Sequence, residues 1–150
     1  MTHAERAKNN FLNGYNCAQS VVLAFADEID VPEKILLAAV MPLGGGLGRL
    51  RETCGAVSGG AVALGLLFPD CPKAEMYAMV QELAHAFAAK NGTINCGQLL
   101  RGAGLPAETV PHPEERTQEY YRKRPCPELI FDAAGIVADI CLRRGRILSC

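Results

Sequence analysis

The spacing of apolar residues along the chain predicts helices rather than strands. Between Phe11 and Phe25, apolar side chains recur three, four or seven positions apart, which places them on one face of a helix. The same period returns between Ile130 and Cys141, whereas the longest segment with strand character is only Thr93–Asn95. We therefore expect an all-α protein, a single-domain bundle of about five to seven helices with no significant sheet.

Capping residues and helix breakers set the expected helix ends. Asn16, Thr53 and Asn95 are suited to accept hydrogen bonds from the first backbone N–H groups of a helix, and Pro32 is suited to a first turn. Asn91-Gly92 is typical of a helix end. The candidate helical segments are 3–12, 17–29, 32–41, 54–67, 72–90, 96–100, 114–122 and 126–144.

One segment, residues 44–68, combines a glycine-rich loop with a helix rich in Gly, Ala and Ser. Within the helix, Gly55 and Gly59 stand four positions apart, as do Ala61 and Gly65, so each pair lies on one face. Interior glycine costs about 1 kcal/mol relative to alanine, so these positions need a structural reason. We expect a neighbouring backbone to approach closely here, and we expect the other helix ends to converge on this segment.

Length and composition favour one domain covering residues 1–150. Its polar, proline-containing part, about 101–125, is expected to be a mobile excursion. A formal net charge of -1 shows no excess of positive charge of the kind that nucleic-acid-binding proteins carry. The longest uncharged apolar run, Ala56–Phe68, is too short to span a membrane. The first residues lack the apolar core of a signal peptide, so we expect a cytoplasmic protein. Seven cysteines in a reducing compartment favour catalysis, redox work or metal binding over a disulfide framework.

Four cysteines, Cys17, Cys54, Cys96 and Cys126, each fall at an expected helix start. The positive end of a helix stabilises a thiolate and lowers the pKa of a cysteine, so we expect these four to form one site. The alternative is that each of these cysteines is a small apolar residue buried in the core, with no chemical role. The remaining three are expected to lie outside the site: Cys71 after a loop, Cys141 on an apolar helix face and Cys150 at the chain end.

The other chemical motifs are weaker. No CxxC pair is present, and the loop Gly44–Arg49 has arginine where a nucleotide-binding loop requires its last glycine. We expect a tight turn there, with Arg49 or Arg51 either solvated or near Cys54 to stabilise a thiolate or bind an acidic substrate. His85, three residues after Glu82, is more typical of a helix surface than of an acid–base role. His3 and His112 support no role, and Tyr15 is expected to pack rather than to contact a sulfur.

Several phrases together resemble a known family. They are Gly14-Tyr15-Asn16-Cys17-Ala18-Gln19, the loop Gly44–Arg49, Cys54-Gly55-Ala56-Val57-Ser58-Gly59, Gly92-Thr93-Ile94-Asn95-Cys96 and a late Cys126. The chain, from about Phe11 to Cys141, resembles the family labelled C-GCAxxG-C-C, which is named for a redox role inferred from its cysteines. One departure is that the label spells Gly-Cys-Ala where this chain reads Cys54-Gly55-Ala56. The resemblance implies a helical redox protein whose four characteristic cysteines are Cys17, Cys54, Cys96 and Cys126, and it implies no particular reaction.

Three hypotheses follow. The first is a thiol-dependent oxidoreductase in which Cys54 attacks a substrate and Cys17 resolves the mixed disulfide, working with an unknown redox partner. The second is a non-enzymatic electron or metal carrier in which the same four cysteines bind an iron–sulfur cluster or a metal ion, since the resemblance extends to some iron–sulfur electron carriers. The third is a helical interaction module with incidental cysteines. We expect a homodimer in each case.

Overall fold

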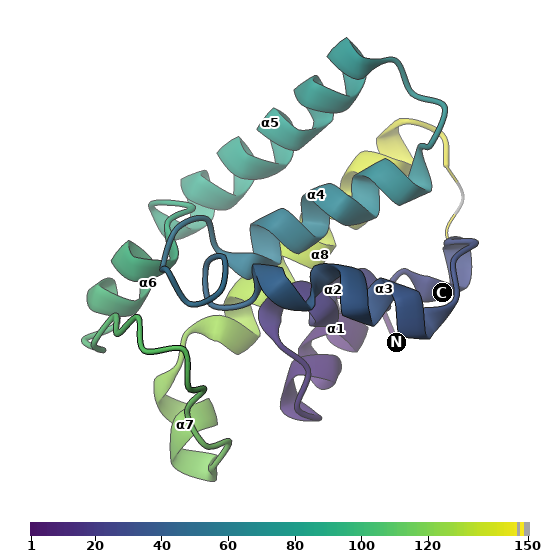
Figure 1. Ribbon diagram of the computed structural model, residues 1–150. Coiled ribbons are helices and arrows are strands. Elements are labelled where there is room, and N and C mark those ends of the chain that lie inside the picture. Colours follow the sequence, from purple (N-terminus) through teal and green to yellow (C-terminus); the bar gives the residue numbers. More distant parts are fainter. Residues whose placement is uncertain (147, 149–150) are drawn as a thin grey trace.

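The computed structural model describes residues 1–146 and 148, and in this part of the chain the fold is all-helical (Figure 1). Eight α-helices and two short 3₁₀ helices occur among these residues, one α-helix more than the upper end of the expectation. Their bounds are α1 His3–Leu12, α2 Cys17–Leu23, η1 Ala26–Glu28, α3 Glu33–Val40, η2 Met41–Leu43, α4 Gly55–Leu67, α5 Lys73–Asn91, α6 Cys96–Gly102, α7 Gln118–Lys123 and α8 Cys126–Arg143. The only β pairing in the described residues is an isolated antiparallel bridge between Thr53 and Asn95.

Side-chain caps mark the starts of four of the eight α-helices in the described residues, α1, α2, α6 and α7. Asn16 accepts a hydrogen bond from the backbone N–H of Gln19 at 2.9 Å, and the Gln19 side chain in turn accepts one from the backbone N–H of Asn16. The Asn95 side chain caps α6 by accepting a hydrogen bond from the backbone N–H of Gln98. Gly92 ends α5 with a left-handed φ of 91°. The expected caps at Asn16 and Asn95 and the expected end at Asn91-Gly92 are confirmed. The expected cap at Thr53 is wrong, because Cys54 is the N-cap residue of α4 and no side chain caps that helix.

Two expected helix bounds are wrong. The segment 17–29 is helical only to Leu23, because the chain tightens into i→i+3 hydrogen bonds at Ala24 and Phe25 and so turns the Phe25 ring into the core. The segment 114–122 contains only α7, since Thr117 caps that helix at the backbone N–H of Tyr120 and fixes its start later in the chain.

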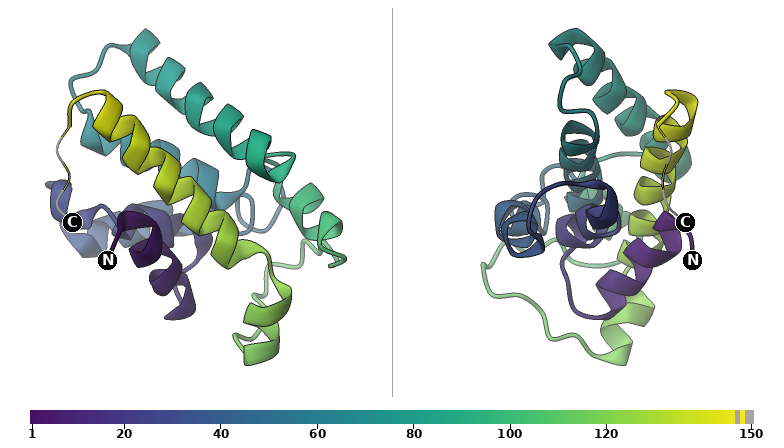
Figure 2. Two further views of the ribbon diagram at one scale, coloured as in Figure 1. Left: turned by 180° about the vertical axis from the view of Figure 1, so that it is seen from behind. Right: turned by 90° about the vertical axis from the view of Figure 1, so that its right-hand side faces the viewer.

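The long helices α4, α5 and α8 pack against one another, and α5 runs roughly antiparallel to the other two (Figures 1 and 2). Helices α1 and α2 cover the other side of this group, α1 against α8 and α2 against α4. Helices α6 and α7 lie apart from each other toward the end of the molecule where α8 begins, and a long loop on the outside connects them (Figures 1 and 2). The first residues of α2, α6 and α8 consequently face the same end.

The core lies between these two groups of helices. The stripe expected from the sequence is confirmed, because Phe11, Val21 and Phe25 are fully buried, as are Ile130 and Cys141 of α8. The other large, fully buried side chains are Val22, Leu64, Leu67, Met79, Leu83, Phe87, Leu100 and Ile140. No helix in the described residues combines the length and the apolar character needed to cross a membrane.

Helices α2 and α4 pack at backbone distance. A Cβ atom at Gly59 would lie 2.7 Å from the carbonyl oxygen of Ala18, and one at Gly55 would lie 3.0 Å from the Cβ atom of Cys17. The close approach expected at Gly55 and Gly59 is therefore confirmed. The same expectation for Gly65 is wrong, because nothing lies within 4 Å of a Cβ atom at that position.

Candidate functional site

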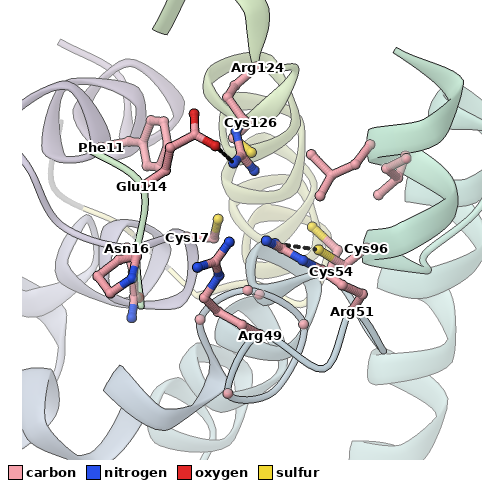
Figure 3. Close-up of a pocket in the computed structure, with 18 of the residues that line it drawn as sticks. Phe11, Asn16, Cys17, Arg49, Arg51, Cys54, Cys96, Glu114, Arg124 and Cys126 are labelled. Atoms are coloured by element: carbon pink, nitrogen blue, oxygen red, sulfur yellow. Dashed lines mark hydrogen bonds and ion pairs between the residues drawn. The ribbon is translucent and has the colours of Figure 1, made fainter. Parts of the chain in front are cut away.

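The four cysteines at helix starts line one cavity of about 460 Å³ (Figure 3). Cys17, Cys96 and Cys126 are the first residues of α2, α6 and α8, and Cys54 is the residue immediately before α4. Figure 3 shows the Cys54 and Cys96 side chains next to each other and the Cys17 and Cys126 side chains on two further sides of the same space. The structure thus brings together the four cysteines that the sequence grouped. All six cysteines in the described residues are unpaired thiols.

Cys17 and Cys126 line the same cavity, and their pKa values shift in opposite directions. Hydrogen bonding with the Cys17 thiol, together with the charges of Arg124, Arg116 and Arg51, lowers the pKa of Cys126 to about 7. The same interaction, with burial, raises the pKa of Cys17 well above its ordinary value. Of the two thiols, Cys126 is therefore the one that ionises more readily near neutral pH.

The expectation that a helix end lowers the pKa of all four thiols is wrong for three of them. Burial raises the pKa of Cys54 to about 12, and the backbone N–H groups of Ala56 and Val57 offset only part of that effect. Burial also raises the pKa of Cys96, against the hydrogen bond and charge of Arg51. A helix end stabilises a charge by about 1 kcal/mol or less in ordinary cases, which is smaller than the cost of burying an uncompensated thiolate.

The glycine loop forms one wall of the cavity in a left-handed conformation. Every residue from Gly45 to Arg49 has a positive φ, between 55° and 73°, and Arg51 follows with 62°. Leu47, Arg49 and Arg51 each adopt this conformation at a cost of about 1–2 kcal/mol, because their Cβ atoms crowd the backbone there. A Cβ atom at Gly46 would lie 2.6 Å from that of Cys96, so glycine lets the loop pass against the cysteine, as the sequence predicted.

Hydrogen bonds hold this loop on the start of α6. The Cys96 backbone N–H donates to the carbonyl of Glu52 at 2.6 Å, and the Gly97 N–H donates to the carbonyl of Arg51 at 3.2 Å. The Cys54 N–H donates to the carbonyl of Ile94 at 2.7 Å, which fixes the start of α4 beside the start of α6. These contacts explain why Cys54 and Cys96 are neighbours although 42 positions separate them.

Arg49 and Arg51 were expected to be either solvated or close to Cys54. Both line the cavity that contains Cys54. Arg51 is buried, at 8% exposed, and its guanidinium lies 3.7 Å from the Cys96 sulfur and 2.9 Å from the carbonyl oxygen of Glu108. Arg49 donates to the carbonyl oxygen of His112. Figure 3 shows both side chains directed from the loop toward the sulfurs.

The proline-rich segment contributes two arginines that the sequence did not identify. Arg116 lies over the ring of Phe11, 4.3 Å from its centroid, and Arg124 lies 4.7 Å from the ring centroid of Tyr120. Both arginines line the cavity. The segment 101–125 was expected to be an excursion, and its described contacts place it over the cavity; its mobility stays a prediction. The one signal in the sequence was the position of Arg124, two residues before Cys126.

The remaining candidates lie elsewhere. Cys141 is fully buried in the core, as predicted, and Cys71 lies in a separate surface hollow with its sulfur 3.7 Å from Glu75. Cys150 is outside the described residues. His85 is exposed on α5, while Glu82 pairs with Arg143, so neither belongs to the cavity.

His3 has a structural role that the sequence did not indicate. It is 6% exposed, its ring stacks on that of Phe25 at 4.7 Å, and its Nε2 atom lies 3.0 Å from the Glu28 carboxylate. The apolar neighbours are close in space but distant in sequence, so no local pattern marked this pair. Tyr15 and the side chain of His112 are not part of the cavity wall.

The alternative interpretation of the four cysteines is a metal or cluster site. Within residues 1–146 and 148, no group of three His, Cys, Asp or Glu side chains is placed to hold a metal ion. The interpretation in which Cys17, Cys54, Cys96 and Cys126 bind an iron–sulfur cluster or a metal ion therefore stays a prediction, for which metal analysis of anaerobically prepared protein is the test.

Comparison with known proteins gives one match. Neither the curated proteins nor the solved structures contain one that matches the chain. One family model, described as "Putative redox-active protein (C_GCAxxG_C_C)", matches residues 15–140, a range that contains all four cavity cysteines and the four arginines. The match covers most of the chain, and it agrees with the resemblance seen in the sequence. The chain belongs to the C_GCAxxG_C_C family.

Proposed function

We propose that the protein is a thiol–disulfide oxidoreductase in which Cys126 attacks a disulfide and Cys17 resolves the product. The observation that carries the proposal is that Cys17 and Cys126 line one cavity together with four arginines, three of which help to lower the pKa of Cys126. A thiolate is the nucleophile in disulfide exchange, and the best attacking thiol has a pKa near the ambient pH. Among the four cavity cysteines, only the pKa of Cys126 is lowered toward neutrality.

The reaction proceeds in two exchange steps. The Cys126 thiolate attacks one sulfur of a substrate R–S–S–R′, forms the mixed disulfide Cys126–S–S–R and releases R′–S⁻, which takes the proton of the Cys17 thiol. The Cys17 thiolate then attacks the Cys126 sulfur, forms the Cys17–Cys126 disulfide and releases R–S⁻. Two electrons pass from the two cysteines to the substrate, and an external dithiol, oxidised in turn to its disulfide, restores the reduced pair.

The cavity explains why the second step follows the first. Cys17 lines the same cavity as Cys126, so its sulfur can reach the mixed disulfide from within the site. Loss of the Cys126 charge removes the acceptor that held the Cys17 proton, and the arginines then favour ionisation of Cys17. Cys54 and Cys96 remain protonated thiols on the far side of the cavity.

This assignment differs from the hypothesis drawn from the sequence, in which Cys54 is the attacking cysteine. Because burial holds the pKa of Cys54 at about 12, its thiolate is scarce near neutral pH. The proposal keeps Cys17 as the resolving cysteine and moves the attack to Cys126. A cytoplasmic location belongs to the same proposal, since unpaired cysteines suit a reducing compartment, and so do an unknown redox partner and a homodimer.

Mass spectrometry of single Cys→Ser variants tests the assignment. Reduced protein is mixed with a small disulfide, and the adducts are mapped. Cys17→Ser is expected to accumulate the mixed disulfide on Cys126, whereas Cys126→Ser is expected to form no adduct quickly. Cys71→Ser serves as the control, because Cys71 lies outside the cavity. Rapid adduct formation in Cys126→Ser, together with its loss in Cys54→Ser, would return the attack to Cys54.

A further inference from the structure

We infer that the disulfide reduced in this cavity is a small molecule whose arms carry negative charge. This inference rests on the proposed function and adds the class of substrate. The observation behind it is the balance of charged side chains in the cavity wall, where four are arginines, Arg49, Arg51, Arg116 and Arg124, and one is acidic, Glu114.

Only one of the four arginines has a carboxylate partner in the wall. Arg124 pairs with Glu114 at 3.0 Å, and the Glu114 side chain is 56% exposed. The other three guanidinium groups contact neutral atoms. Arg51 donates to the Glu108 carbonyl oxygen, and Arg49 to that of His112.

Arg116 follows the same pattern. It donates to the backbone carbonyl oxygen of Phe11 at 3.1 Å and to that of Tyr15 at 3.2 Å. Carbonyl oxygens satisfy the N–H groups of a guanidinium without cancelling its charge. The wall therefore carries about three uncompensated positive charges.

Burial makes this arrangement costly without an anion. Arg51 is 8% exposed, and no carboxylate of the described residues lies within ion-pair distance of it. Arg49 shows the effect of its neighbours, because burial and the charges of Arg51 and Arg124 lower its pKa. An unpaired charge taken out of water destabilises the folded protein unless a counter-ion joins it. A negatively charged ligand supplies that counter-ion.

The Cys126 thiolate accounts for only part of the charge. It contributes one negative charge before the reaction, and this charge is lost when the mixed disulfide forms. The site then holds its full positive charge beside the released arm of the substrate. An anionic arm is consequently attracted before the attack, and the leaving thiolate is stabilised during it.

The dimensions and the remaining wall limit the substrate to a small molecule. A cavity of about 460 Å³ falls in the range of small-molecule sites, about 300–1,000 Å³. Its outer residues include Met41, Pro42, Pro111 and Pro113, which contact the carbon chain of an arm without adding charge. Two short arms with terminal carboxylates match this combination of an apolar border and a basic interior.

Three synthetic disulfides with identical two-carbon arms test the inference. They are 3,3′-dithiodipropionate, with two negative charges, bis(2-hydroxyethyl) disulfide, with none, and cystamine, with two positive charges. The second-order rate of oxidation of the reduced, full-length protein is measured for each by stopped flow. Each rate is divided by the rate of the same disulfide with N-acetylcysteine amide, which removes differences in intrinsic reactivity.

The normalised rates are expected to favour the dianion over the dication by a factor on the order of 10–1,000, the range of electrostatic steering into a charged cleft. Added salt is expected to reduce this ratio. Arg49→Gln is expected to lower the ratio of dianion to neutral rates several-fold. The matched control is Arg122→Gln, since Arg122 is an exposed arginine of α7, 73% exposed, and is not part of the cavity wall.

The outcomes separate the inference from the proposed function. Fast oxidation by all three disulfides at equal normalised rates, or a preference for cystamine, overturns the inference and leaves the thiol chemistry standing. Slow oxidation by all three, at the rate of an ordinary free thiol, overturns the proposed function itself. An equal loss of selectivity in Arg122→Gln and Arg49→Gln also overturns the inference. That result would mean that the net charge of the protein, rather than the arginines of the cavity, causes the preference for the dianion.

Discussion

Two glycines of α4 provide a matched test of how closely this helix packs. A Cβ atom at Gly59 would lie 2.7 Å from the Ala18 carbonyl oxygen and 2.8 Å from the Ala18 Cα atom, both backbone atoms of α2. A Cβ atom at Gly65, in the same helix, would meet nothing within 4 Å. We therefore compare Gly59→Ala with Gly65→Ala, which make the same chemical change in the two surroundings.

The expected magnitudes follow from two opposing effects. Replacing an interior helix glycine with alanine stabilises the helix by about 1 kcal/mol, and at Gly65 this is the main effect. At Gly59 the new methyl group must push α2 away, and overpacking of this kind costs about 1–3 kcal/mol. The free energy of unfolding of Gly59→Ala is therefore expected to be lower than that of Gly65→Ala by about 1–3 kcal/mol.

Urea unfolding of the reduced proteins, followed by circular dichroism, measures this difference. For a domain of this size, 1 kcal/mol corresponds to about 2–4 °C in the melting temperature, so thermal scans give a second measurement. Gly59→Ala also moves α2, and with it Cys17, so the pKa of Cys126 is expected to rise. Equal stability of the two variants would refute the close packing of α2 on α4 and the role of residues 44–68 as the organising segment.

Three further predictions concern the thiols. The rate of iodoacetamide alkylation of Cys126 is expected to rise with pH through a midpoint near 7, and Arg124→Gln is expected to move that midpoint upward because it removes a charge that stabilises the thiolate. Cys17→Ala is expected to raise the midpoint of Cys126 alkylation more than Cys17→Ser does, since serine keeps a hydrogen-bond donor. Equal shifts would contradict hydrogen bonding from Cys17 to Cys126. The contribution of the protonated Cys54 thiol to the free energy of unfolding is expected to be constant below about pH 9 and to be lost toward pH 12, because this buried thiol ionises more readily in the unfolded chain. Urea unfolding at a series of pH values measures this decrease, and Cys54→Ala is expected to make it smaller.

The parts of the fold that depend on local chemistry could be predicted from the sequence. Asn16 and Asn95 cap their helices as expected, and the buried stripe from Phe11 to Phe25 follows directly from the apolar period. The end of α2 could not be predicted in the same way. Its chain turns at Ala24 because the Phe25 ring is buried against other elements, and tertiary packing of this kind leaves no trace in the helical period.

The members of the candidate site were more predictable than their electrostatics. A cysteine at an expected helix start is visible in the sequence, and this signal found all four. The pKa of each thiol depends on burial and on side chains from distant segments. Cys54 is buried deeply enough to stay protonated, and Cys126 is influenced by Arg116 and Arg51, which no local spacing relates to it.

The proposed disulfide between Cys17 and Cys126 would link two distant parts of the chain. The two residues are roughly 110 positions apart, so a bond between them ties α2 to the start of α8 and turns most of the chain into a closed ring. Closing a loop of about 100 residues removes conformational entropy from the unfolded chain worth about 4.7 kcal/mol in the chain-entropy description. The oxidised protein is then expected to survive longer against proteases than the reduced one. The turnover of the protein in a cell would in this way follow the redox state of a single pair of sulfur atoms.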